Sequence, residues 1–339
     1  MTNRSQPIFV VALIATCLAL CVVVLGAYVR LSDAGLGCPD WPGCYGRLVA
    51  PTAPTAVANA NQAFPDRPVQ SPKAWKEMIH RYAASTLGLL ILGIAFLSFR
   101  RREDRQQPLR LPLFLVGLVV LQGMLGMWTV TLLLKPLIVT LHLLGGMTTL
   151  LLLWWLTLRL KWRDFAGAVA PAGQGLRLFV VLALTVVYCQ IALGGWTSSN
   201  YAAIACGASF PRCNGHWWPA MDFKDGFTVW RGLGVNYEYG VLDAPARTAI
   251  HMTHRFGALL TFLVVGTLAV RCLATGLSSL QKAGMALALA LVIQVSLGIA
   301  NVRLGLPLPV AVAHNAGAAV LLLSLATVLH LLTPARLRQ

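Results

Sequence analysis

The chain has 339 residues, of which 57% are hydrophobic and 11% are charged, and its mean hydropathy is +0.71. Soluble domains carry about 25% charged residues, so this composition excludes a soluble domain, a disordered tail, a fibrous repeat and a small disulfide scaffold. It predicts a polytopic membrane protein. The net charge of +16 fits that class, because basic residues collect in cytoplasmic loops. No nucleic-acid-binding motif accompanies the charge, so we expect no nucleic-acid partner.

Apolar stretches of roughly 20 residues, each long enough to cross the hydrocarbon core of a bilayer, recur eight times along the chain. Helices are expected in lipid because they satisfy their own backbone hydrogen bonds. The first stretch lacks a small-residue cleavage site, which favours a retained span over a removed signal peptide. The predicted spans are 8–29, 79–99, 111–132, 137–158, 177–197, 248–271, 284–302 and 309–332.

The distribution of charge predicts the orientation. With both termini in the cytoplasm, 14 of the 27 basic residues but only 3 of the 11 acidic residues fall on the inner side. This is the arrangement that the positive-inside rule favours. The inner basic residues are Arg4, Arg100, Arg101, Arg102, Arg105, Arg110, Arg159, Lys161, Arg163, Arg177, Arg271, Lys282, Arg336 and Arg338, with Glu103, Asp104 and Asp164 as the acidic ones.

Two long loops, 30–77 and 198–247, then lie on the outer side, and we expect them to form compact caps over the membrane face. Each contains a pair of cysteines, Cys38 with Cys44 and Cys206 with Cys213. Disulfides persist on the oxidising side of a membrane, and exposed disulfides can also exchange. A structural staple is the more common outcome, and a redox role stays open.

An internal duplication relates the two halves of the chain. Landmarks of the first half recur in the second at offsets of 169, 174 and 172 residues. They are Gly26-Ala27-Tyr28 and Gly195-Trp196-Thr197, Glu77-Met78-Ile79-His80-Arg81-Tyr82 and His251-Met252-Thr253-His254-Arg255-Phe256, and Gln122 with His142 and Gln294 with His314. We therefore predict two tandem four-helix bundles, residues 1–165 and 166–339, related by a pseudo-two-fold axis along the membrane normal.

Two pairs of histidines lie inside the predicted spans, His80 with His142 and His254 with His314. All four spans run inward from the outer side, so the imidazoles are expected at one depth near the outer face. Ionisable residues within spans are costly and mark functional sites. Two imidazoles on facing helices can ligate one haem iron axially. The alternatives are helix–helix hydrogen bonding and zinc, for which neither half offers further ligands at suitable spacing.

The residues beside these histidines differ between the halves. Arg81 and Arg255 each follow a histidine, and their guanidinium groups suit haem propionates, although an interfacial arginine can equally extend toward water. Three residues before its histidine, the first half has Glu77 and the second has His251. A carboxylate at one site only is a candidate acid or base. The alternative is that Glu77 only caps or solvates the end of its helix.

Together these motifs resemble the haem A synthase family of the CtaA type. The resemblance rests on residues 26–42, which read Gly-Ala-Tyr-Val-Arg-Leu-Ser-Asp-Ala-Gly-Leu-Gly-Cys-Pro-Asp-Trp-Pro, and on the two His-Arg motifs with His142 and His314. It covers the chain from the first span to the last. The second outer loop departs from the pattern by an insert to which we assign no role. The insert includes Asp222, Lys224, Asp225 and Arg231.

The resemblance implies an oxidoreductase that converts the C8 methyl of haem O to a formyl group by successive hydroxylations, giving haem A for cytochrome oxidase. It implies that His80 and His142 flank haem O, with Glu77 near the methyl as proton acceptor or carbocation stabiliser. His254 and His314 would be the axial ligands of a permanent haem b. The family's cysteine pairs map onto Cys38–Cys44 and Cys206–Cys213.

The implied location is the bacterial cytoplasmic membrane, with membrane lipid around the chain. Haem O synthase and an electron acceptor, either a quinone or a redox protein, are the implied partners. Two other functions stay open from the residues alone. A non-catalytic di-haem b electron carrier would have carboxylate-free sites in both halves, and a haem transporter would need a substrate pathway, which the sequence does not reveal.

Overall fold

The computed structural model describes residues 6–104, 108–161 and 174–333, and among these residues all regular elements are helices, with no strand. Eight helices are long and apolar enough to cross a membrane, which confirms the predicted number of spans. These helices are α1 (Gln6–Leu31), α3 (Ser71–Arg100), α4 (Arg110–Thr131), α5 (Pro136–Lys161), α6 (Gln174–Ser199), α8 (Ala244–Leu273), α9 (Ser278–Arg303) and α10 (Leu308–Leu331).

The two helices that follow the long loops begin earlier than predicted, α3 at residue 71 instead of 79 and α8 at residue 244 instead of 248. Pro72 and Pro245 stand in the first turns, where a missing N–H costs no helical hydrogen bond. The Asp243 side chain accepts a bond from the backbone N–H of Ala246 (3.0 Å) and caps α8. As a result, Glu77 lies inside α3 and not ahead of it.

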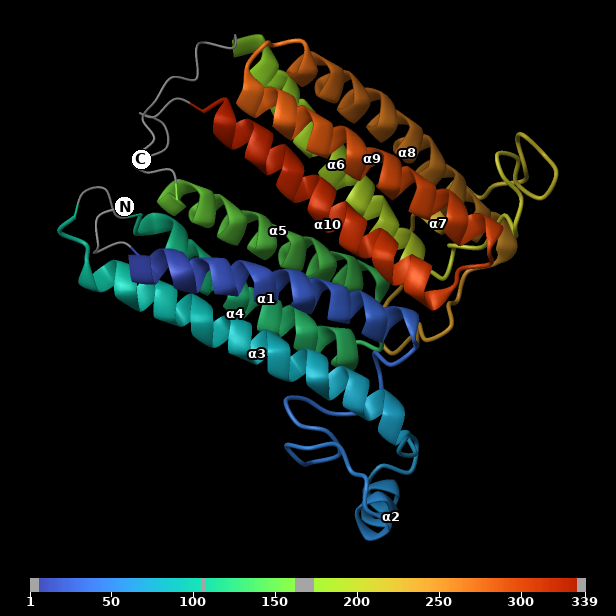
Figure 1. The fold of residues 1–339 in the computed structure, drawn as a ribbon. Helices are drawn as coiled ribbons and strands as arrows, with labels where there is room; N and C mark the ends of the chain where they lie inside the picture. Colours follow the sequence, from blue (N-terminus) through green and yellow to red (C-terminus); the bar gives the residue numbers. More distant parts are fainter. Residues whose placement is uncertain (1–5, 105–107, 162–173, 334–339) are drawn as a thin grey trace.

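Each long loop contains a short helix that was not predicted, α2 (Pro54–Ala63) and α7 (Phe223–Gly226). α2 projects from the end of the helices in Figure 1. The first loop has a small core of its own around its disulfide and the start of α3, so it is a folded cap. That core consists of Cys38, Cys44, Tyr45, Ala50, Ala60, Ala74 and Met78.

The charged residues of the insert in the second loop have local structural roles. The Asp222 carboxylate accepts a hydrogen bond from the backbone N–H of Asp225 (2.9 Å) and caps α7. Arg231 forms an ion pair with Asp225 (2.6 Å). Lys224 is exposed. These contacts shape the loop.

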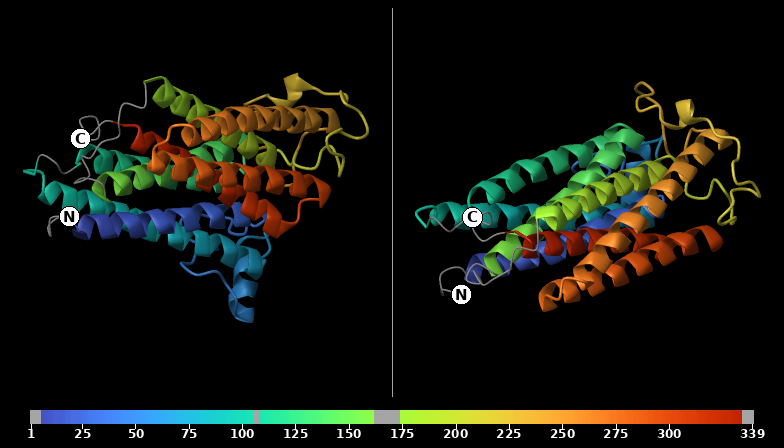
Figure 2. Two further views of the ribbon diagram at one scale, coloured as in Figure 1. Left: turned by 45° about the horizontal axis from the view of Figure 1, so that its top comes forward. Right: turned by 90° about the horizontal axis from the view of Figure 1, so that it is seen from above.

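The long helices pack as two sets of neighbours, as the views in Figures 1 and 2 show. In the first set α1 contacts α3, α3 contacts α4, α4 contacts α5, and α5 returns to α1. The second set repeats this order with α6, α8, α9 and α10. The sets meet where α1 contacts α10, α5 contacts α6, and α5 contacts α10. Hydrogen bonds from Trp154 to Thr327 (2.9 Å) and between Thr148 and Tyr188 (2.7 Å) cross this boundary.

The long loops with α2 and α7 lie at one end of the helices, and α1 begins and α10 ends at the other (Figure 1). The described basic residues Arg100, Arg101, Arg102, Arg110, Arg159, Lys161, Arg177, Arg271 and Lys282 lie toward that other end. Arg4, Arg105, Arg163, Asp164, Arg336 and Arg338 fall outside the described residues. The side of the membrane that each end faces stays a prediction.

Part of the second loop is bound to the first set of helices. We call residues 230–239 the crossing segment. Glu238 forms an ion pair with Arg67 of the first loop (3.0 Å). The Tyr237 N–H donates to the carbonyl oxygen of Leu133, between α4 and α5 (3.0 Å). The Lys135 side chain, only 2% exposed, donates to the Gly232 carbonyl and lies 3.4 Å from the centroid of the Trp230 ring. Residues of the second half thus cover the loop end of the first.

Candidate functional site

The first histidine pair faces across the interior of the first set of helices. The centroids of the His80 and His142 rings are 6.5 Å apart, and their planes are nearly perpendicular at 84°. Two metal–nitrogen bonds of about 2 Å each, with the ring radii added, take up about this span. Each ring rests on a glycine of a neighbouring helix, because a Cβ at Gly26 or Gly126 would lie 3.1 or 3.4 Å from the imidazole Cε1.

The second pair has the same surroundings. His254 on α8 and His314 on α10 hold the equivalent positions in the second set of helices. A Cβ at Gly194 would lie 3.4 Å from Cε1 of His254, and one at Gly298 would lie 3.1 Å from Cε1 of His314. All four imidazoles therefore pack against a glycine of the helix that precedes theirs in the bundle.

Two imidazoles in each half fit a metal whose other ligands do not come from the protein. The Nδ1 atoms of His80, His142 and His314 are buried without a hydrogen-bond partner, and such nitrogens are costly unless they bind something. Within the described ranges, no group of three or more His, Cys, Asp or Glu side chains could hold a metal ion. Haem iron needs only two axial ligands from the protein, because the porphyrin supplies the others. Two imidazoles per half suit that demand.

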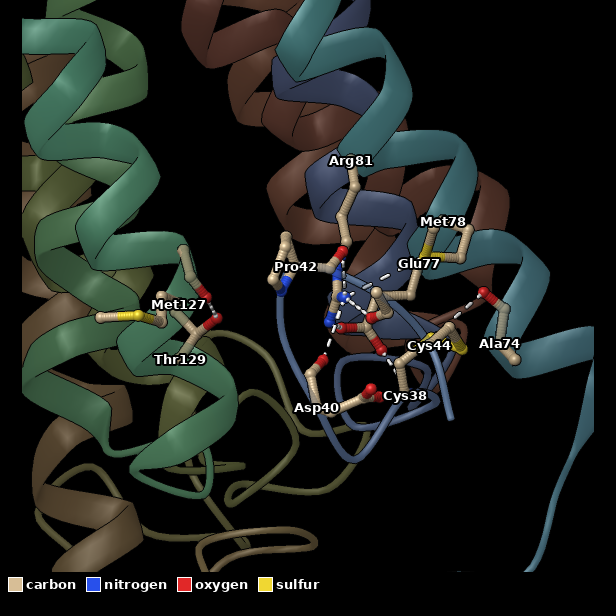
Figure 3. Close-up of polar contacts among 12 residues, drawn as sticks. Cys38, Asp40, Pro42, Cys44, Ala74, Glu77, Met78, Arg81, Met127 and Thr129 are labelled. Atoms are coloured by element: carbon tan, nitrogen blue, oxygen red, sulfur yellow. Dashed lines mark hydrogen bonds and ion pairs between the residues drawn. A yellow bond between two sulfur atoms is a disulfide. The ribbon is translucent and has the colours of Figure 1, made fainter. Parts of the chain in front are cut away.

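Glu77 is 5% exposed and lies one turn before His80 on α3. One carboxylate oxygen forms an ion pair with Arg81 (2.5 Å), and the other accepts the backbone N–H of Cys38 (2.9 Å). Figure 3 shows the carboxylate between the arginine and the disulfide loop. The acid is thus held by two donors, one of them charged, and such hydrogen bonds are the stronger kind.

Arg81 joins this carboxylate to the first loop. Its guanidinium donates to the carbonyl oxygens of Asp40 (3.1 Å), Pro42 (3.2 Å) and Gly43 (2.5 Å), and Figure 3 shows it inside the turn of the loop. The Asp40 carboxylate in turn accepts two backbone N–H groups five and six residues on, from Tyr45 and Gly46 (both 2.7 Å). Burial raises the pKa of the Tyr45 hydroxyl, and the nearby Arg67 opposes that shift.

The second half repeats the arrangement with a different partner. Arg255 donates to the carbonyls of Ser209 (2.9 Å), Arg212 (3.1 Å) and Pro211 (3.4 Å) in the second disulfide loop. Its Nε donates to Nε2 of His251 (3.0 Å), the residue that replaces Glu77. The halves therefore share a scaffold and differ in the group that it holds.

Sequence reasoning missed this use of the arginines. Arg81 and Arg255 were assigned to propionates or to the interface, but in the structure both bind carbonyl oxygens of the loop in their own half. Contact of a haem propionate with the remaining N–H groups of Arg81 and Arg255 stays a prediction. The signal was available, since each His-Arg motif is preceded by a cysteine-containing loop rich in proline and glycine, whose carbonyls lack helical partners.

Both cysteine pairs are disulfide-bonded, Cys38 with Cys44 and Cys206 with Cys213. All four cysteines have no exposed surface. Each bond closes the loop whose carbonyls bind the arginine of the same half. The disulfides therefore belong to the supports of Glu77 and His251.

Arg81→Met is expected to lower the thermal stability of the protein in detergent, because it leaves the buried Glu77 carboxylate without its cation. Breaking one side of a buried ion pair costs about 3–5 kcal/mol. The double variant Arg81→Met with Glu77→Gln should recover part of that loss. Hydrogen exchange of residues 38–46 and thermal unfolding measure the effect, with Arg47→Met at an exposed position as control. Equal stability of Arg81→Met and Arg47→Met would contradict the role of the ion pair.

Comparison with known proteins agrees with the geometry. Residues 9–326 match the COX15-CtaA family model, described as cytochrome oxidase assembly protein. The chain is 46% identical over 309 residues to the heme A synthase of Shewanella oneidensis, covering 91% of this chain and 92% of the relative. It is 26% identical to that of Caulobacter vibrioides over 79% of both chains, and 28% identical to that of Shouchella clausii over 59% and 62%. The chain therefore belongs to the COX15-CtaA family of cytochrome oxidase assembly proteins.

Proposed function

We propose that this chain is a haem A synthase, an oxidoreductase that converts haem O to haem A by oxidising the C8 methyl to a formyl group. The observation that carries the proposal is that Glu77 lies beside one histidine pair and has no acidic counterpart beside the other. Two matched histidine pairs lie on one scaffold, and only the first has a buried carboxylate one turn from a histidine. The family and its heme A synthase relatives support the same activity.

The fold that we propose for this activity is a duplication. Residues 1–165 and 166–339 form tandem four-helix bundles related by a pseudo-two-fold axis along the membrane normal. Pairing α1 with α6, α3 with α8, α4 with α9 and α5 with α10 supports this relation, because every helix contact within one set then has an equivalent in the other. The same pairing exchanges the α1–α10 contact with the α5–α6 contact.

The two sites have different tasks in this proposal. His80 and His142 bind the iron of the substrate haem O, and His254 and His314 bind the iron of a resident haem b. When bound, haem b supplies one-electron redox chemistry at a potential that its axial ligands and burial set. The glycine beneath each imidazole, described above, supports this assignment, because it lets each ring approach a neighbouring backbone closely.

Glu77 acts on the substrate methyl. Removal of hydride or electrons from an unactivated methyl leaves a positive centre, and a fixed carboxylate stabilises that centre where water is scarce. The carboxylate also accepts a proton as the methyl is oxidised. Arg81 and the Cys38 N–H hold it in place, so that little reorganisation is needed. His251 occupies the matching position in the second half, where it pairs with Arg255 and offers no negative charge.

We assign the disulfides a structural role. A thiol that exchanges with a disulfide must reach a sulfur atom, and the zero exposure of the four cysteines argues against such access.

The protein lies in the bacterial cytoplasmic membrane with its termini in the cytoplasm and the long loops outside, as the basic residues of the short connections favour. Haem O synthase would supply the substrate, and a quinone or redox protein would accept electrons.

Expression in bacteria that make haem O but lack haem A synthesis tests the proposal. We expect a formyl haem, detected by mass spectrometry and by the pyridine haemochrome spectrum of extracted haem. Purified protein that holds haem b while the cells contain no formyl haem would overturn the enzyme and favour the di-haem electron carrier.

A further inference from the structure

Three of the four histidines share a pattern that extends beyond the imidazole itself. A glutamine stands four residues before the glycine that underlies the ring, and a second glycine stands three residues after the histidine. The helices that carry the two parts are neighbours in each case. The sets are Gln122 and Gly126 with His142 and Gly145, Gln190 and Gly194 with His254 and Gly257, and Gln294 and Gly298 with His314 and Gly317.

The second glycine leaves a space, here called the seat, that the glutamine amide occupies. A Cβ added at Gly145, Gly257 or Gly317 would meet the glutamine amide of the same set at less than 3.0 Å, a distance that real Cβ atoms essentially never show. The amide therefore lies in the space that any other residue would fill. Such an overlap would force the side chain to move, so glutamine and glycine depend on each other.

The amides of Gln190 and Gln294 lie beside the histidines of their sets. Nε2 of Gln190 is 3.0 Å from Nδ1 of His254 and 2.9 Å from the His254 carbonyl oxygen. Nε2 of Gln294 is 3.4 Å from Nε2 of His314, so in this set the amide contacts the other ring nitrogen. The amide oxygens of both glutamines are buried without a partner, as is the amide nitrogen of Gln122. A half-turn of the Gln190 amide would present its oxygen to the Nδ1 proton that an imidazole carries when it binds metal through Nε2, at the cost of the amide's hydrogen bond to the His254 carbonyl.

His80 is the exception. It rests on Gly26 like the others, but Val22 stands where the glutamine is expected and Ala83 stands where the second glycine is expected. Both members of the pair are replaced together. This is the outcome that the steric argument requires, because without a seated amide there is room for a Cβ.

We propose that Gln122, Gln190 and Gln294 are positioning residues, each of which fixes the orientation of one haem-ligating imidazole, and that His80 has no glutamine partner and only the Val22 backbone carbonyl beside its ring. The inference rests on the proposed function, which makes these histidines axial ligands. A resident haem b has both of its ligands fixed in this way. The substrate site has one ligand with a glutamine, His142, and one without, His80, and a less restrained ligand suits a site that must release its product.

The first test replaces the glutamines of the second half. In Gln190→Met or Gln294→Met, haem b is expected to transfer to apomyoglobin about 10–100-fold faster than from the parent protein, the usual effect of losing a partner of a metal ligand. The low-spin signal of haem b in electron paramagnetic resonance should shift. Gln190→Glu keeps an acceptor oxygen and should restore slow transfer. The control is Gln62→Met at an exposed position of the first loop. Transfer as slow as in the parent protein would overturn the proposal.

The second test builds the missing set. Val22→Gln together with Ala83→Gly should increase the haem that the first half retains through purification, whereas Val22→Gln alone should not, because the Ala83 Cβ occupies the seat. Equal retention in the single and double variants would overturn the proposal. Both tests read haem retention, so they stay separate from the formation of formyl haem that tests the proposed function.

Discussion

Glu77→Gln is expected to reduce haem A formation by at least about 100-fold while haem b stays bound. The amide keeps the size of the side chain and still accepts the Cys38 N–H, but it loses the negative charge. Removing one preorganised electrostatic group from an active site costs about 10²–10³ in rate. The measurement is the ratio of formyl haem to haem O extracted from cells that lack other haem A synthesis, with the haem b content of the purified protein determined in parallel.

Two comparisons separate this effect from damage to the fold. Glu103→Gln changes a carboxylate that is exposed at the opposite end of α3, and it should leave haem A formation unchanged. Thermal unfolding shows whether Glu77→Gln weakens the cap through the loss of its ion pair with Arg81. A parent-like yield of haem A from Glu77→Gln would remove this residue from the mechanism.

The second large effect is expected at the other histidine pair. His254→Ala or His314→Ala should remove haem b from the purified protein and with it the low-spin haem spectrum. Loss of a partner of a ligand already costs about 10–100-fold in affinity, so loss of the ligand itself should cost at least as much. Haem A formation should fall as well, because electrons no longer have an exit.

The control for this experiment is His216→Ala, which changes an exposed histidine of the second loop. That variant should keep the parent spectrum. Size-exclusion chromatography and thermal unfolding of the His254 and His314 variants identify failure to fold. A folded variant with a full haem b spectrum would refute the assignment of the second site.

Much of the fold could be predicted from the sequence because lipid imposes a simple rule. Each span must be apolar over about 20 residues, and eight such stretches stand out. The starts of α3 and α8 could not be predicted in this way, because they lie outside the apolar stretch and depend on Pro72, Pro245 and the Asp243 cap. The same holds for α2, which is too polar and short to produce an apolar pattern.

The candidate site divides along similar lines. The histidine pairs and the lone Glu77 are rare residue types in apolar surroundings, so they are visible in the sequence. The partners of Arg81 are backbone carbonyls, which every residue possesses and which no sequence pattern marks. The glutamine seats fall between these cases. Gln122 and Gln294 were noticed as landmarks of the repeat, but their meaning depends on where Gly145 and Gly317 meet them in space.

The crossing segment, residues 230–239, bears on the way the protein is made. A chain leaves the ribosome from its N-terminus, so all four helices of the first set are synthesised before the residues that bind Lys135 and Arg67. The contacts of these two residues with the crossing segment therefore form only after translation has passed residue 239.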